Sequence, residues 1–352
     1  IVYAIAAGLS MAATAMVARR VGERDREAAA DAAVQAVGLG LIIALAIAVP
    51  GAVYAADLLR LMGGSPDLVA AGQGYTRWML AGNGTIMGIF MLNAVFRGAG
   101  DAALAMRVLW LANGLNIVLD PCLIFGWGPF PELGLAGAAV ATTASRAVGV
   151  AYQCALLGRG RGALRIARRH LRLRGPVMLR LARVSLGGIG QYLISTSSWI
   201  VLVRLVSHFG ASAVAGYTVA IRIILFVLMP SWGVANAAAT LVGQNLGAGR
   251  PDRAAASVWR TGWYNAGFLA LVAVVFIAWP RSLVAVFTDD PVVLDFGEAC
   301  LRIIAYGYGF YAFGMVVTQG FNGAGDTVTP TVINFFCYWC FQLPLAWVLA
   351  LR

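Results

Sequence analysis

The chain contains 352 residues, of which 61% are apolar and 12% are charged, and its mean hydropathy is +0.80. This composition excludes a soluble globular enzyme, in which roughly half of the residues are apolar, and it excludes disorder, which requires low hydrophobicity. Five cysteines are too few for a disulfide-stabilised scaffold. The formal charge of +11 arises from 26 arginines against 15 acidic residues, and in a membrane protein it must be read connector by connector.

Ten apolar stretches follow one another along the chain, separated by short polar connectors. Nearly all of them exceed the roughly 20 residues with which a helix crosses a bilayer, and they lack the alternation of barrel strands. We therefore predict an all-α polytopic membrane protein. The predicted spans are 1–19, 28–56, 68–96, 102–127, 133–158, 184–209, 211–245, 255–288, 292–321 and 327–351.

The arginines are distributed unevenly among the connectors. The first, third, fifth, seventh and ninth connectors together hold 17 arginines, whereas the others hold two. By the positive-inside rule the odd-numbered connectors face the cytoplasm. The fifth, 159–183, carries nine arginines and is predicted to be a cytoplasmic linker between an N-terminal lobe, 1–158, and a C-terminal lobe, 184–352. Contact with anionic headgroups explains its charge better than nucleic acid does.

The chain also contains an internal repeat. When the sequence is shifted by 225 residues, ten identities fall within 66–101, and they include the run Phe-x-Gly-Ala-Gly-Asp at Phe96–Asp101 and Phe321–Asp326. Equivalent positions are six spans apart, so the two halves share one orientation and are related by a pseudo-two-fold axis along the membrane normal. The offset predicts twelve helices in two six-helix bundles, with the first helix, part of the second and the twelfth outside these 352 residues.

One polar motif lies inside a predicted span. Asn116 and Asp120 are four residues apart, which places both on one helix face, and Pro121 follows directly. Asp120 lies about 27 Å along the helix from Ala102, towards the outer end. Proline removes a backbone donor and tends to kink a helix, so a carboxylate, an amide and loosened carbonyls can together bind a proton or a small hard cation. The alternative is an interfacial aspartate that is simply solvated.

Other polar residues inside the spans carry weaker predictions. The intramembrane arginines either pair with acidic groups or snorkel to the lipid headgroups. They are Arg77, Arg146, Arg204, Arg222 and Arg302. A second set either lines a cavity for amphipathic cations or bonds helices together; it comprises Gln191, Tyr192, Asn236, Tyr308, Tyr311 and Gln319. We find no catalytic constellation and no metal motif, so we predict neither an enzyme nor a cofactor.

The motifs resemble those of the multidrug and toxic compound extrusion (MATE) family. The segments 116–126 and 131–142 resemble its fifth and sixth helices, and Leu241–Gly249 resembles a cytoplasmic signature. The resemblance implies a cation site formed by Asn116, Asp120 and Thr142, with Thr143 as an alternative to Thr142. Members that place the cation in the C-terminal lobe use acids in the seventh and tenth helices. Here 184–209 contains no acid, and 292–321 has only two near its outer end, which favours the N-terminal site.

The resemblance also implies a function. We expect a secondary active antiporter that exports organic, often cationic, drugs or metabolites in exchange for H⁺ or Na⁺ by rocker-switch alternating access. The alternative is a flippase of the same superfamily for a lipid-linked precursor, which would need a more cationic central cavity. We expect a multi-pass monomer in a bacterial cytoplasmic membrane, in contact with lipids and a small organic substrate, with no nucleic-acid partner.

Overall fold

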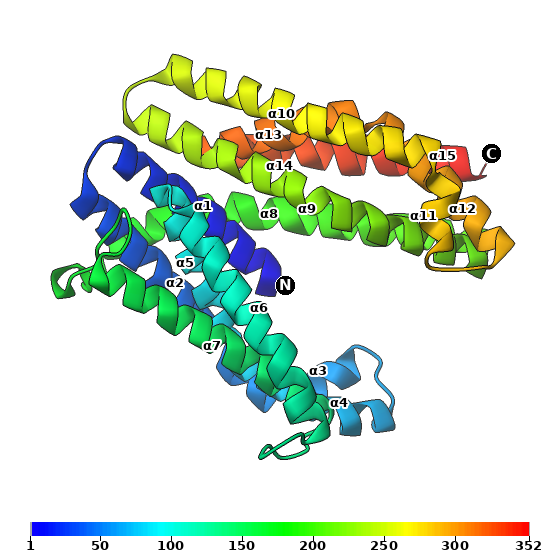
Figure 1. Ribbon diagram of the computed structural model, residues 1–352, viewed down its shortest axis with the longest axis horizontal. Coiled ribbons are helices and arrows are strands. Elements are labelled where there is room, and N and C mark those ends of the chain that lie inside the picture. Colours follow the sequence, from blue (N-terminus) through cyan, green and yellow to red (C-terminus); the bar gives the residue numbers. More distant parts are fainter. Residues whose placement is uncertain (1, 352) are drawn as a thin grey trace. The chain divides into compact units, whose positions relative to one another are not determined.

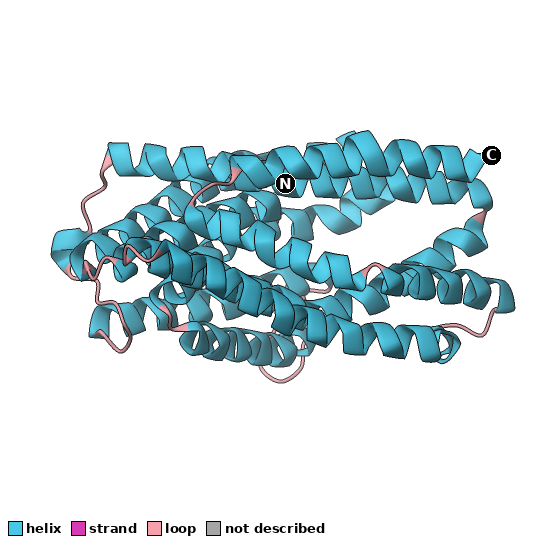
Figure 2. Ribbon diagram, turned by 90° about the horizontal axis from the view of Figure 1, so that it is seen from above, coloured by secondary structure: helices cyan, strands magenta, loops and turns pink. Residues whose placement is uncertain are grey.

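The computed structural model describes residues 2–351, and every regular element within them is a helix (Figure 2). This result confirms the predicted all-α polytopic fold. The chain divides into two compact units, Ile1–Ser185 and Leu186–Arg352. The boundary falls inside one continuous helix, α8 (Gly175–Val206), which contributes its first turns to the first unit and the rest to the second.

The first unit is built from seven α-helices and the start of α8 (Figure 1). Its elements are α1 (Val2–Gly22), α2 (Arg26–Val53), α3 (Ala55–Leu61), α4 (Pro66–Ala81), α5 (Asn83–Ala99), α6 (Ala102–Phe125), α7 (Leu135–Arg159) and the short turn η1 (Arg168–His170). Helices α1, α2 and α5 pack on one another, and α7 packs against α4, α5 and α6. The buried residues of α1 are mostly alanines, which let neighbouring helices approach closely.

The second unit follows a related plan (Figure 1). After α8 come η2 (Ser207–Phe209), α9 (Ala211–Gly247), α10 (Pro251–Ala278), α11 (Pro280–Ala285), α12 (Pro291–Tyr306), α13 (Tyr308–Ala324), α14 (Val328–Phe335), the π-helical η3 (Phe336–Gln342) and α15 (Leu343–Leu351). Helix α9 packs against α10, α12 and α13, and these contacts enclose the apolar core of this unit.

The helices account for the predicted spans. Seven described helical segments are long and apolar enough to cross a membrane, and the bent pairs α4–α5 and α12–α13 each pass the same test as one span. The one remaining predicted span, 133–158, coincides with α7. This helix has 25 residues, which is enough to cross, but polar side chains at Thr142, Thr143, Ser145, Arg146 and Gln153 make it less apolar than the others.

The internal repeat explains the two bends. Gly82 separates α4 from α5 with a bend of 42°, and Gly307, 225 residues later, separates α12 from α13 with a bend of 61°. In the first unit the backbone N–H and the hydroxyl of Thr85 both donate to the carbonyl of Gly82, at 2.9 Å. In the second, the Tyr311 N–H donates to the Gly307 carbonyl at 3.0 Å. Both halves therefore contain the same broken span.

The Phe-x-Gly-Ala-Gly-Asp run ends a helix in both units by the same turn. Gly100 and Gly325 have φ values of 93° and 90°, a left-handed conformation that favours glycine. The aspartate after each glycine donates its N–H to the phenylalanine carbonyl five residues earlier, at 2.8 and 3.0 Å. These bonds satisfy carbonyls at the helix end, as in a Schellman cap.

The first glycine of each run permits a close helix contact. A methyl group added at Gly98 would lie 2.9 Å from the Thr14 carbonyl oxygen, and one added at Gly323 would meet the Ala239 carbonyl. Thr14 and Ala239 are themselves 225 residues apart. The sequence repeat thus encodes one helix-packing contact twice, α5 on α1 and α13 on α9.

The two aspartates of the repeat have different side-chain partners. Asp326 accepts hydrogen bonds from the N–H groups of Val328 and Thr329 and from the Thr329 hydroxyl at 2.6 Å, so it caps α14. The Thr329 bonds hold the pKa of the Asp326 carboxyl below its usual value. The side chain of Asp101 makes no cap bond and instead accepts the N–H of Ala163 in the basic linker.

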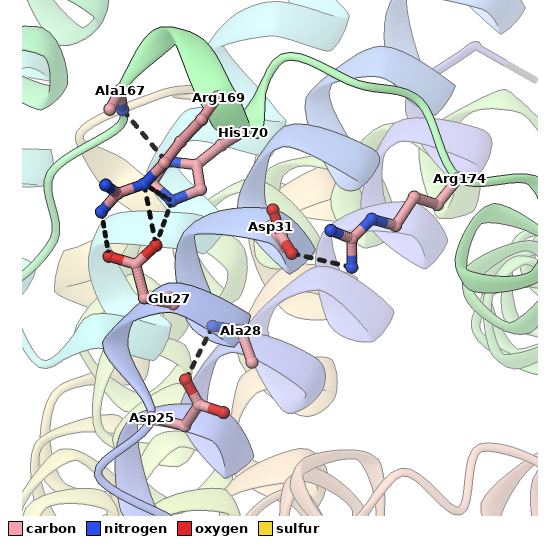
Figure 3. Close-up of polar contacts among 8 residues, drawn as sticks. All are labelled: Asp25, Glu27, Ala28, Asp31, Ala167, Arg169, His170 and Arg174. Atoms are coloured by element: carbon pink, nitrogen blue, oxygen red, sulfur yellow. Dashed lines mark hydrogen bonds and ion pairs between the residues drawn. The ribbon is translucent and has the colours of Figure 1, made fainter.

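The basic linker is bound along one face of α2 (Figure 3). Glu27, Asp31 and Gln35 recur every fourth residue on this helix, so they share a face. Glu27 accepts from Arg169 at 3.1 Å and from His170 Nε2 at 2.8 Å, and Asp31 pairs with Arg174 at 3.0 Å.

Backbone contacts complete this attachment. The Gln35 amide donates to the carbonyl of Arg172 at 2.8 Å and accepts the N–H of Arg174 at 2.7 Å. The Ala167 N–H donates to His170 Nδ1, so Nε2 carries the hydrogen directed at Glu27. The segment predicted as a linker between lobes is thus packed onto the first unit.

Candidate functional site

The structure joins the two polar residues of the α6 motif by a hydrogen bond. The Asn116 Nδ2 donates to Asp120 Oδ1 at 2.9 Å, as their spacing of one helical turn allows. This bond leaves the second carboxylate oxygen of Asp120 and the carbonyl oxygen of the Asn116 amide as acceptors. Both side chains are partly buried. Oxygen acceptors of this kind can hold a proton or a hard cation.

The packing of α6 defines where the pair lies. Helix α7 approaches α6 closely: a methyl group at Gly149 would lie 3.3 Å from the Ala112 Cβ, and one at Gly137 would meet the Leu123 carbonyl. Asn116 lies one turn after Ala112 and so borders this packed face. Ile117, about 100° further round the helix from Asn116, is 72% exposed. Asp120 lies between these two directions, so the carboxylate is at the edge of the helix interface.

Pro121 lies within α6, which continues to Phe125 and does not end at the proline. Because proline has no N–H, the carbonyl of Ile117 lacks the donor that a regular helix supplies. This carbonyl belongs to the same turn as Asn116 and Asp120, so it adds a third kind of oxygen to the neighbourhood of the pair.

The structure separates the two threonine candidates on α7. A methyl group at Gly82 would lie 2.6 Å from the Thr143 hydroxyl oxygen, so Thr143 packs against the break between α4 and α5. Thr142 is partly buried, and its carbonyl accepts the Ser145 hydroxyl at 3.0 Å. No described contact joins Thr142 to Asp120, and its part in a cation site stays a prediction.

Two of the predicted cavity residues form part of a polar network in the second unit. Gln191 is 5% exposed, and its amide donates to Asn322 at 3.0 Å and to the Thr327 carbonyl at 3.1 Å. The Asn322 amide in turn donates to Gln319 at 3.3 Å. The bonds of Gln191 connect α8 to the end of α13, so Gln191 bonds helices together in this structure, whereas Gln319 contacts a residue of its own helix.

The remaining cavity candidates differ in exposure. Tyr308 is 2% exposed, and its ring packs on Phe276 with 5.8 Å between centroids, so it belongs to the apolar core. Tyr192 and Tyr311 are 43% and 40% exposed. Asn236 donates to the Trp232 carbonyl at 2.9 Å on an exposed part of α9.

Most of the intramembrane arginines have partners. Arg77 donates to the Ala52 carbonyl at 3.2 Å, and Arg146 donates to the Tyr3 hydroxyl at 3.1 Å. Arg302 pairs with Glu298 at 2.9 Å.

The acids near the outer end of α12 are also paired. Arg281 contacts both Asp295, at 2.7 Å, and Glu298, and these two carboxylates raise the pKa of its guanidinium. Both acids of this predicted span are thus neutralised by arginines. That the C-terminal half does not hold the cation stays a prediction.

Sequence reasoning did not single out several buried polar residues. Asn265 is fully buried; it accepts the Ser231 hydroxyl at 2.7 Å and donates to the Ala312 carbonyl at 3.0 Å. Gln153 donates to Asn93 at 2.8 Å in the first unit. The signal available was polarity inside an apolar span, which does not distinguish a site from a bond between helices.

Fold and site together define a polytopic helical membrane protein with an acid–amide pair inside a span and with duplicated halves, which are found in many secondary transporters. Residues 1–122 and 189–348 match the family described as MatE. The chain therefore belongs to the MatE family, and it is a MATE-family transporter.

Individual relatives support this assignment over most of the chain. The probable multidrug resistance protein NorM of Thermotoga maritima is 28% identical over 99% of this chain and 75% of its own length. The FAD transporter of Shewanella oneidensis is 25% identical over 98% of this chain and 76% of its own. A solved structure of the outward-facing conformation of a multidrug resistance MATE family transporter superposes with a TM-score of 0.91 at 27% identity, covering 99% of this chain and 77% of that one.

Proposed function

We propose that the protein exports small organic compounds from a bacterial cell across the cytoplasmic membrane in exchange for H⁺ or Na⁺. The names of its relatives point to drugs in one case and to FAD in another, so the proposed substrate class is broad. The observation that carries the coupling is the bonded pair Asn116–Asp120, at the edge of the interface between α6 and α7.

Ion exchange follows from the chemistry of this pair. A carboxylate inside a membrane is costly when charged, so it gains from binding a proton or a metal cation. Asn116 fixes the orientation of the Asp120 carboxylate, and the acceptor oxygens around it suit either ion. Binding on the outer side and release on the inner side, alternating with substrate, would couple the ion gradient to export by a rocker-switch exchange between two accessible states.

The test is transport by purified protein in proteoliposomes. Ethidium movement is driven in separate arms by an imposed pH gradient and by an imposed Na⁺ gradient. We expect Asp120→Asn to abolish gradient-driven movement while equilibrium ethidium binding persists. The matched control is Glu132→Gln, which removes a carboxylate from the exposed loop after α6. Undiminished driven transport by the Asp120 variant in both arms would remove this residue from the mechanism.

A further inference from the structure

Arg222 lies well inside a predicted span of the second unit and has no side-chain partner among the described residues, unlike Arg302. It lies eleven residues after the start of α9 at Ala211, about 16 Å along the helix and close to half the hydrocarbon thickness. Arg302 lies at the same distance from the start of α12 but pairs with Glu298. Arg222 makes no hydrogen bond or ion pair within the described residues, and its side chain is exposed.

No acidic residue of this unit pairs with Arg222 among the described residues. Asp290 and Asp326 cap helices, and Asp295 and Glu298 bind arginines at the outer end of α12. Asp252 lies in the first turn of α10, at the predicted cytoplasmic end, and Asp289 lies in the exposed loop between α11 and α12. Because an unpaired guanidinium facing lipid near the membrane centre costs several kcal/mol, such a group is expected to line a water-filled space. We therefore expect the exposed face of α9 around Arg222 to be in contact with water.

The same face continues with apolar and aromatic groups. Phe226, Met229 and Trp232 follow Arg222 along the exposed side of α9 and are 80%, 57% and 41% exposed. They lie about 6, 10 and 15 Å further along the helix axis, towards the cytoplasm.

We infer that this face of α9 is a substrate site for organic anions, in which Arg222 binds a carboxylate or phosphate and Phe226, Met229 and Trp232 contact an aromatic or apolar body. A guanidinium suits these groups because it can donate two parallel hydrogen bonds to them. The inference rests on the proposed export function for its substrate role. It narrows the substrate class away from the organic cations that the family resemblance implies.

Equilibrium binding tests the site directly. Fluorescein, an aromatic anion, and ethidium, an aromatic cation, are titrated against purified protein in phosphatidylcholine nanodiscs, with fluorescence anisotropy as the readout. We expect Arg222→Gln to weaken fluorescein binding about tenfold or more, because one charge-assisted hydrogen-bonded contact is lost. The affinity for ethidium should be unchanged. Arg222→Glu should reverse the preference between the dyes.

The matched control is Arg302→Gln, which removes an equally deep but paired arginine and should bind fluorescein as the wild type does. Nanodiscs containing phosphatidylglycerol distinguish a lipid occupant, since a headgroup bound at Arg222 would compete with fluorescein. Unchanged fluorescein affinity in Arg222→Gln, competition by the lipid, or wild-type preference for ethidium would each overturn the inference. Intact fluorescein binding without gradient-driven efflux of either dye would instead contradict the proposed export function.

Discussion

The buried hydroxyl of Tyr308 leads to a prediction about stability. The side chain is 2% exposed, and its ring packs in the core beside Phe276, but the hydroxyl has no hydrogen-bond partner among the described residues. Burying a hydroxyl without a partner costs about 1–3 kcal/mol. Tyr308→Phe keeps the ring and removes the unsatisfied group, so we expect it to stabilise the protein by about this amount.

The expected change is large enough to measure. For a unit of this size 1 kcal/mol corresponds to about 2–4 °C in Tm, so the variant should melt roughly 2–12 °C above the wild type. Thermal unfolding in detergent, followed by tryptophan fluorescence, provides the measurement. Tyr311→Phe is the control, because this side chain is 40% exposed and the loss of its hydroxyl should be neutral or slightly destabilising. A lower Tm for Tyr308→Phe would show that the hydroxyl is satisfied and that the reasoning is wrong.

Three further predictions concern the repeat and the linker. Gly323→Ala places a methyl group against a backbone carbonyl and should cost about 1–3 kcal/mol, whereas Gly314→Ala, with open space around it, should be neutral or slightly stabilising; Tm values compare them. Asp326→Ala removes a helix cap and should cost about 1 kcal/mol at neutral pH. Hydrogen bonds lower the folded-state pKa of Asp326. Its contribution to stability is therefore complete above the unfolded carboxyl pKa of about 4 and is lost as the pH falls below that value. The Tm difference between this variant and the wild type should accordingly shrink in acid. Glu27→Gln weakens the attachment of Arg169, and limited trypsin digestion should cut the linker faster than in the wild type; an unchanged rate would mean that Glu27 does not hold it.

Much of the fold could be predicted because the membrane limits the possibilities. Apolar length sets the spans, and the arginine distribution orients them. The match at Gly98 and Gly323 predicted equivalent helices, and the structure shows why these positions are glycines: each lies on the backbone of another helix. The breaks at Gly82 and Gly307 were not predicted, since a single glycine in an apolar stretch does not reveal whether the helix bends there.

The candidate sites were less predictable. The spacing of Asn116 and Asp120 correctly implied contact, because a helical turn brings such residues together. Gln191 and Tyr308 were grouped as cavity candidates, yet one bonds helices together and the other is core, since polarity within a span does not reveal which neighbour a side chain meets. The sequence does not distinguish Arg222 from the other four intramembrane arginines, whereas the structure distinguishes it from Arg77, Arg146 and Arg302, each of which has a side-chain partner.

The aspartates at the ends of the duplicated run show how gene duplication separates backbone from side-chain roles. Asp101 and Asp326 occupy equivalent turns, but Asp101 binds the linker at Ala163, whereas Asp326 binds the start of α14 at Thr329. The same substitution at the two positions should therefore have different effects: it should loosen the linker in the first half and fray the start of α14 in the second. The duplicated turn is therefore kept in the main chain of both halves, while the role of each aspartate side chain is set by the residues that lie beside it.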